Sequence, residues 1–147
     1  MMTDEVALVL LPSVLYRSGQ LLDVARLARA ARERSIPLLL DCAHSAGVLQ
    51  HRLDDWGVDC AVWCSYKYLN GGPGAPAFLY VNRRHRERAT RLAGWFGFVK
   101  ERQFDLRLDF EQQLGAAGWQ ISSPGILGAA PVEGALSVVF EAGIERI

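Results

Sequence analysis

The stretch that decides the fold is Cys60-Ala61-Val62-Trp63-Cys64-Ser65-Tyr66-Lys67-Tyr68-Leu69-Asn70-Gly71-Gly72. Its first five residues are apolar and have the length of a buried strand, and its end is a glycine-rich turn. A single lysine, Lys67, therefore closely follows the strand. In open α/β sheets, ligands bind at the carboxyl ends of the strands. The sequence predicts that Lys67 lies at such a ligand-binding edge.

An acid and a histidine follow a second apolar run in the same way. Residues 36–40 are apolar, Asp41 follows them, and His44 comes shortly after. Taken singly, a lysine after a strand is usually solvated, an aspartate there usually caps a helix, and a histidine is usually an ordinary loop residue. At successive strand ends, the three together favour a site for pyridoxal 5'-phosphate (PLP). The lysine would form a Schiff base, and the carboxylate would keep the pyridine nitrogen protonated.

The N-terminal half predicts strands and a helix in alternation. Residues 6–11, closed by Pro12, are a continuous apolar run typical of a strand buried on both faces. Residues 21–35 place apolar side chains at helical spacing with arginines opposite, which predicts an amphipathic helix. Residues 38–40 predict the next strand. This order indicates a parallel crossover, and hence an α/β fold with a mostly parallel sheet flanked by helices.

Further elements are predicted downstream. Residues 59–65 and 75–81 each have the length and apolar character of a strand. Residues 83–92 are strongly basic and predict a helix. Because no aromatic residues are interleaved with the arginines, a solvated helix face is favoured over a nucleic-acid patch. After an aromatic turn at 94–98 and a loop-like segment, residues 126–141 predict a largely buried helix.

Composition argues against several classes of function. The chain has 147 residues with 16 basic and 16 acidic side chains, so no net charge attracts nucleic acid or an anionic membrane. No apolar run approaches the roughly 20 residues that span a bilayer. The acidic start does not resemble a signal peptide, which makes the cytoplasm the expected location. Three cysteines cannot form a fully paired disulfide set, and without a suitable histidine partner we expect no metal site.

Several motifs resemble one family, and they occur in the same order along the chain. They are LPSVLYRSGQ at 11–20, DCAHSAG at 41–47, DDWGVD at 54–59, WCSYKYLN at 63–70 and GWFG at 94–97. Over nearly its whole length the chain resembles the kynureninases, which are PLP-dependent hydrolases of the aspartate aminotransferase fold, type I. In the related cysteine desulfurases a histidine typically stands directly before the lysine, where this chain has Tyr66.

The resemblance implies roles for the residues near the lysine. Lys67 would bond the cofactor and then shuttle the Cα proton of the substrate. Asp41 would bind the pyridinium nitrogen, with His44 beside the cofactor, and Tyr66 would hydrogen-bond the phosphate and serve as a proton donor. The implied reaction is hydrolytic cleavage of the Cβ–Cγ bond of L-kynurenine or 3-hydroxykynurenine in tryptophan catabolism, which yields anthranilate or 3-hydroxyanthranilate and alanine.

Other residues are implied to act in a homodimer. Trp95 would reach the phosphate from the neighbouring subunit, Ser123 would bind phosphate or substrate across the interface, and Phe96 would wall the substrate's aromatic ring. Two positions depart from the family pattern. Ser123 stands where Asn or Thr is common, and Phe98 stands where many relatives have histidine. Both departures bear on substrate preference more than on cofactor binding.

The resemblance also implies that the chain is part of a larger enzyme. Residues 1–124 match the central part of a PLP-binding large domain without its N-terminal portion, and residues 125–147 match the helix that leads toward a small domain. Two alternatives stay open. One is another class V aminotransferase-like enzyme, such as a cysteine desulfurase or lyase, and the other is an inactive remnant built on the same core.

Overall fold

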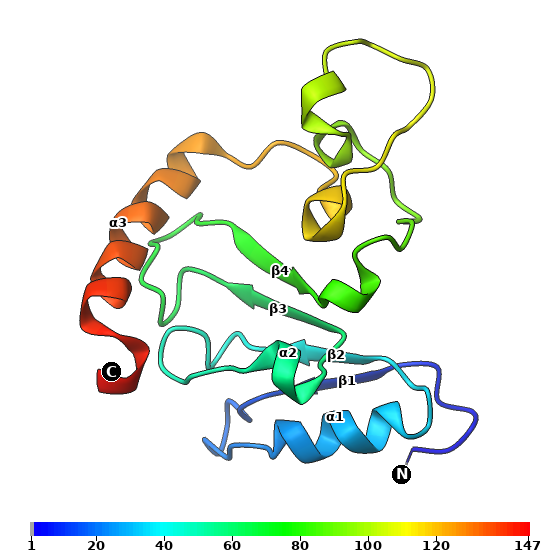
Figure 1. The fold of residues 1–147 in the computed structure, drawn as a ribbon. Helices are drawn as coiled ribbons and strands as arrows, with labels where there is room; N and C mark the ends of the chain where they lie inside the picture. The colour runs from blue at the N-terminus through cyan, green and yellow to red at the C-terminus, as the bar shows by residue number, and fades with distance from the viewer. Residues whose placement is uncertain (1) are drawn as a thin grey trace.

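A computed structural model describes residues 2–147, and its centre is one four-stranded sheet (Figure 1). The strands are β1 (Val9–Pro12), β2 (Leu38–Asp41), β3 (Cys60–Cys64) and β4 (Ala77–Val81), and they lie in that order across the sheet. The first three strands are parallel, and β4 is antiparallel to β3. The predicted α/β fold with a mostly parallel sheet is confirmed.

Two helices connect the parallel strands. α1 (Val24–Arg32) leads from β1 to β2, and the short α2 (Leu53–Trp56) leads from β2 to β3. α1 is shorter than the predicted 21–35, because Asp23 caps its first turn by accepting a hydrogen bond from the backbone N–H of Arg26 at 3.0 Å. The core lies between α1 and the sheet, and its buried residues are Val24, Ala28, Ala31, Leu38, Leu40, Cys42, Val58 and Ala61.

β1 is an edge strand, and the prediction that it is buried on both faces is wrong. Val9 packs against the core, whereas Leu10, the next residue, is 59% exposed. Successive residues of a strand face opposite sides of the sheet, and solvent reaches the side that lies opposite α1. The apolar run therefore marks a strand, but only one of its faces is covered.

The basic segment after β4 does not form the predicted helix over 83–92. A single 3₁₀ turn, Arg83–His85, occurs there. The physical reason is Asp59, just before β3, whose Oδ1 accepts hydrogen bonds from Arg84 Nη2 at 2.6 Å and from His85 Nε2 at 2.5 Å. Its Oδ2 accepts from the backbone N–H of Leu38 at 2.9 Å. One carboxylate thus ties the starts of β2 and β3 to the turn after β4.

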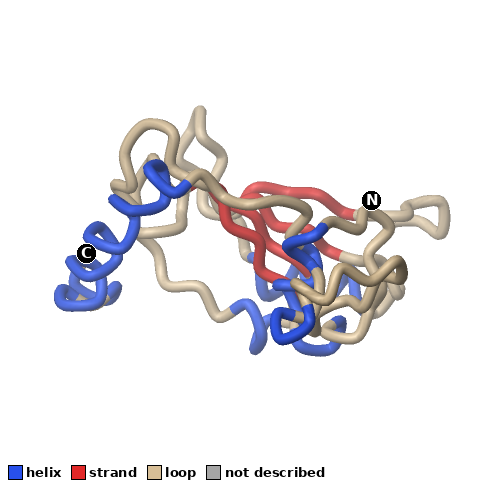
Figure 2. The backbone as a smooth tube through the Cα atoms, turned by 90° about the horizontal axis from the view of Figure 1, so that it is seen from above, coloured by secondary structure: helices blue, strands red, loops and turns tan. Residues whose placement is uncertain are grey.

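α3 (Ile126–Ala142) lies beyond the ends of the strands, as Figures 1 and 2 show. Val132 is its one buried residue, so the prediction of a largely buried helix is wrong. The helix rests on the glycine loop that follows β3. A Cβ on Gly128 would come within 2.4 Å of the Gly74 carbonyl oxygen, and a Cβ on Gly71 would lie 3.0 Å from the Val132 side chain.

Candidate functional site

The carboxyl ends of β1, β2 and β3 meet at one edge of the sheet. Asp41, the last residue of β2, pairs in register with Pro12 of β1 and Val62 of β3. Lys67 lies in the loop after β3, and its Nζ donates a hydrogen bond to Nε2 of His44, 3.2 Å away in the turn after β2. The structure thus brings His44 and Lys67 into direct contact. We call Asp41, His44 and Lys67 the strand-edge cluster.

One carboxylate oxygen of Asp41 has no hydrogen-bond partner among residues 2–147. Its Oδ1 accepts a hydrogen bond from the backbone N–H of Ala43 at 2.8 Å, and no hydrogen bond to Oδ2 occurs among residues 2–147. Leu40, the preceding residue, is fully buried in the core beside α1. Because residues alternate along β2, the Asp41 side chain points to the opposite face of the sheet. Oδ2 can therefore accept a hydrogen bond from a protonated ring nitrogen.

Tyr16 joins the strand-edge cluster from the loop after β1, and the sequence analysis did not select it as a site residue. Its ring centre lies 5.9 Å from that of His44, with an angle of 30° between the ring planes. The side chain is exposed. Its position is the signal that could have identified it, since a loop that follows a parallel strand emerges at the same edge as the loops after β2 and β3.

Tyr66 lies beside Lys67 and keeps its proton near neutral pH. The Lys67 Nζ lies 6.0 Å from the centre of the Tyr66 ring. A hydrogen bond with the Cys64 side chain and the charge of its thiolate form raise the pKa of the Tyr66 hydroxyl above its ordinary value of 10.0. The hydroxyl is therefore suited to donate a proton rather than to accept one.

Trp95, Phe96 and Ser123 lie in a later segment, and within residues 2–147 no hydrogen bond or ring contact joins them to the strand-edge cluster. The indole Nε1 of Trp95 donates to the Gln103 carbonyl oxygen at 3.0 Å. The Lys100 Nζ lies 4.6 Å from the centre of the Phe96 ring. Ser123 is exposed. The single chain therefore does not bring these three residues to Lys67.

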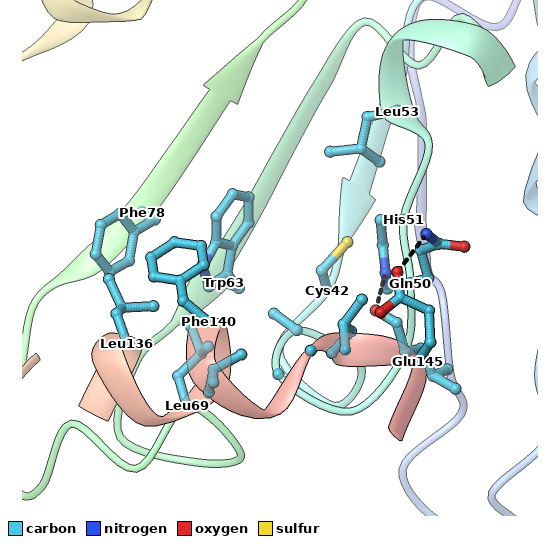
Figure 3. A pocket seen from close by; sticks show the side chains of 16 residues that line it. Cys42, Gln50, His51, Leu53, Trp63, Leu69, Phe78, Leu136, Phe140 and Glu145 are labelled. Atoms are coloured by element: carbon cyan, nitrogen blue, oxygen red, sulfur yellow. Dashed lines mark hydrogen bonds between the residues drawn. The ribbon is translucent and has the colours of Figure 1, made fainter. Parts of the chain in front are cut away.

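A cavity of about 680 Å³ lies on the other side of the turn after β2 (Figure 3). Its walls are mostly apolar, with Trp63 and Phe78 of the sheet near Phe140 of α3, and His51 lies at its polar end. Cys42 also lines the cavity, and burial raises the pKa of its thiol, which therefore stays protonated. The strand-edge cluster does not line this cavity, so the cavity is a separate feature.

Comparison with known proteins identifies the family to which the chain belongs. A family model described as aminotransferase class V matches residues 1–146. The chain belongs to the class V aminotransferase family. Its curated relatives include the kynureninases of Geobacillus thermodenitrificans and Bacillus anthracis, which are 51% and 50% identical to this chain over 146 residues. The expected resemblance to kynureninases is confirmed. Each match covers 99% of this chain and 34% of the relative, so the chain spans about a third of these relatives' length.

Solved structures share the class V fold. The cystine C–S lyase C-DES, in complex with its product cysteine persulfide, matches with a TM-score of 0.80 at 20% identity, over 99% of this chain and 39% of that chain. The cysteine desulfurase CsdA of Escherichia coli matches with a TM-score of 0.76 at 17% identity, over 99% and 35%. At these identities the likeness concerns the fold alone. Across residues 2–147, no helix has both the length and the apolar character needed to cross a bilayer.

Proposed function

We propose that this chain carries the catalytic lysine of a PLP-dependent hydrolase that cleaves the Cβ–Cγ bond of L-kynurenine or 3-hydroxykynurenine. The products are anthranilate or 3-hydroxyanthranilate, and alanine. The observation that carries the proposal is the contact between Lys67 and His44 at the edge of the sheet where β2 ends in Asp41. The 51% identity with a kynureninase favours this reaction over a desulfurase reaction, because the desulfurase and lyase structures support only the fold.

The residues at this edge fit PLP. Lys67 supplies a primary amine that can bond the aldehyde carbon of the cofactor, and Oδ2 of Asp41 can accept a hydrogen bond from its ring nitrogen. When bound, PLP supplies an electron sink for negative charge that develops on the substrate carbons. A solved C-DES structure, at 19% identity, holds glycine covalently linked to a PLP cofactor on the same fold.

Each polar side chain at the edge then has a defined task. With PLP bound, Asp41 would hold the proton on the ring nitrogen, because a nearby carboxylate favours the charged form of the ring. His44 orients the Lys67 amine by accepting a hydrogen bond at Nε2. Lys67 Nζ would take up the proton of the substrate Cα, and the Tyr66 hydroxyl would be a proton donor at Oη. Each acid or base of this kind is worth roughly 100- to 10,000-fold in rate.

The proposal extends to a homodimer that works in the cytoplasm, in tryptophan catabolism and NAD biosynthesis. Within residues 2–147, neither Trp95 nor Ser123 has a hydrogen bond or ring contact with the strand-edge cluster, which supports a second subunit because the resemblance assigns both residues to a site across the interface. Trp95 is 50% exposed and is therefore accessible to a partner. Phe96, its neighbour, would wall the aromatic ring of the substrate.

Borohydride reduction tests the cofactor site. The chain contains two lysines, Lys67 and Lys100, so incubation with PLP, reduction and peptide mass mapping assigns the modified residue without ambiguity. We expect a pyridoxyl group on Lys67 in the wild type and in Lys100→Arg, and none on Lys67→Arg. A label on Lys100, or no label on the wild type, would contradict the proposal, and the latter result would favour an inactive remnant.

A substrate assay distinguishes the candidate reactions. The unreduced protein with PLP is mixed with L-kynurenine, and anthranilate is followed by its fluorescence while alanine is quantified. Equal amounts of the two products support C–C hydrolysis. Sulfide release from cysteine, without anthranilate formation from kynurenine, would favour a desulfurase instead.

A further inference from the structure

A chain of hydrogen bonds runs behind the strand-edge cluster through Ser13, Ser45 and His51. The two serines are 1% and 0% exposed, and their hydroxyl oxygens lie 2.5 Å apart. Ser45 Oγ lies 2.9 Å from His51 Nε2, and His51 Nδ1 lies 2.8 Å from the Leu49 carbonyl oxygen. Because a carbonyl oxygen only accepts, Nδ1 donates to Leu49. In the neutral imidazole Nε2 then accepts from Ser45, and Ser45 in turn accepts from Ser13.

This hydrogen-bond chain joins the loops that follow β1 and β2. Ser13 comes directly after β1, and its backbone N–H donates to the Asp41 carbonyl oxygen at 2.9 Å. Ser45 lies in the turn after β2, next to His44. The bond between the two hydroxyls therefore fixes the turn that presents His44 relative to the strand end that presents Asp41.

The same turn is held from its other side by the loop that carries Lys67. Gly47 has a φ of +98°, and a Cβ there would lie 2.7 Å from the Tyr68 carbonyl oxygen, so the two backbones touch. The hydrogen bond from Lys67 to His44 spans the same two loops. Since this contact and the serine pair hold the turn from opposite sides, the location of His44 depends on both.

We infer that Ser13, Ser45 and His51 are positioning residues that set where Asp41 and His44 meet the cofactor. The inference rests on the proposed function, because it concerns residues behind the PLP site. Burying two hydroxyls beside an imidazole is favourable only while every member of the network is hydrogen-bonded. The loss of one member leaves its neighbour without a partner, so the neighbour no longer has a fixed position. Changes at Ser45 and His51 should therefore alter cofactor binding through His44.

The test compares Ser45→Ala with Asn82→Ala in the full chain. Asn82 is 4% exposed and donates to the Val58 carbonyl oxygen near the start of β3, so Asn82→Ala removes a comparably buried hydrogen bond at the opposite end of the sheet. Both variants should unfold at a lower temperature. Ser45→Ala alone should raise the Kd for PLP, by about tenfold, the effect that loss of an outer orienting group commonly has at metal sites. It should also weaken the absorbance band of lysine-bound PLP.

Two His51 variants keep the test decisive where Ser45→Ala fails to fold. His51→Phe retains a ring without either hydrogen bond and should reproduce the loss in PLP affinity, whereas His51→Gln restores an acceptor and should recover most of it. Wild-type affinity in both Ser45→Ala and His51→Phe, or an equal loss in Asn82→Ala, would overturn this inference alone. A wild-type chain that takes up no PLP on Lys67 would overturn the proposed function, and the inference with it.

Discussion

Replacing Asp59 with alanine removes the carboxylate that connects the starts of β2 and β3 to the turn after β4. The Asp59 side chain is 16% exposed, and its oxygens accept hydrogen bonds from the backbone N–H of Leu38 at 2.9 Å, from Arg84 at 2.6 Å and from His85 at 2.5 Å. Leu38 is 1% exposed, so its N–H cannot turn to bulk water for a new acceptor. The change therefore leaves a buried donor without a partner.

The size of the expected loss follows from these contacts. A buried N–H that loses its acceptor costs about 1–3 kcal/mol. The Arg84 side chain is 34% exposed, so its ion pair with Asp59 is screened by solvent and adds about 1 kcal/mol. We expect Asp59→Ala to lower the free energy of unfolding by about 3 kcal/mol. Asp59→Asn keeps an acceptor oxygen for Leu38 and should cost about 1 kcal/mol.

Urea titration followed by tryptophan fluorescence measures both variants against the wild type. The midpoint should shift most for Asp59→Ala, while the m-value stays constant because unfolding exposes the same surface. A loss smaller than about 0.5 kcal/mol for Asp59→Ala would refute the reasoning. Equal losses for the two variants would show that the bond to the Leu38 N–H contributes nothing.

The same carboxylate predicts a dependence on acid. Burial raises the pKa of Asp59, but the hydrogen bonds from the Leu38 N–H, Arg84 and His85 outweigh burial and hold this pKa below its ordinary value of 3.8. A carboxyl whose pKa is lowered by folding contributes its full stability above its unfolded value, and the contribution disappears as the pH falls through the folded value. The stability advantage of the wild type over Asp59→Asn should therefore shrink as the pH is lowered below about 4.

Three further substitutions test the site and the core. Asp41→Asn should lower the turnover of L-kynurenine by roughly 100-fold, because a neutral partner no longer holds the ring nitrogen protonated, and near-normal anthranilate formation would show that Asp41 has another role. Gly47→Ala should cost more than about 1 kcal/mol, since the left-handed backbone and the Tyr68 carbonyl leave no room for a Cβ, and an unchanged thermal unfolding curve would contradict this. Leu40→Ala, at a fully buried position, should cost about 2–5 kcal/mol in a urea titration. Its control, Leu10→Ala at a 59% exposed position, should cost about 0.5 kcal/mol or less.

The strands were the part of the fold that sequence reasoning predicted best. β2 and β3 were located closely because strands with neighbours on both sides are apolar until the chain reaches the edge of the sheet, where Asp41 and Ser65 appear. The same rule misjudged β1, since Leu10 is apolar but lies on an uncovered face. An apolar run identifies a strand, whereas the burial of each face of that strand depends on which other elements pack against it.

Predictions for the helices failed where distant contacts decide the structure. The segment 83–92 has the composition of a solvated helix, yet Asp59, far earlier in the chain, holds Arg84 and His85 in a turn. α3 is apolar enough to predict burial, yet Val132 is its one buried residue, where the helix meets the glycine loop after β3. Periodicity reports on local spacing, so it carries no information about such partners.

The candidate site was predictable where chemistry and topology coincide. His44 and Lys67 follow parallel strands, so their loops had to emerge at one edge, and their side chains meet there. The pairing of Ser13 with Ser45 was not predictable, because serines are common in loops and nothing local indicates that hydroxyls 32 residues apart bond each other. Trp95 remains a prediction, since a single chain does not test a residue expected to act on a neighbouring subunit.

The contact between α3 and the glycine loop links two parts of the molecule mechanically. A Cβ on Gly128 would come within 2.4 Å of the Gly74 carbonyl oxygen, and Gly71 lies close to Val132, so a tilt of α3 toward the sheet would press on this loop. Gly71 comes four residues after Lys67, so the packing of α3 and the placement of the lysine backbone depend on one short segment of chain.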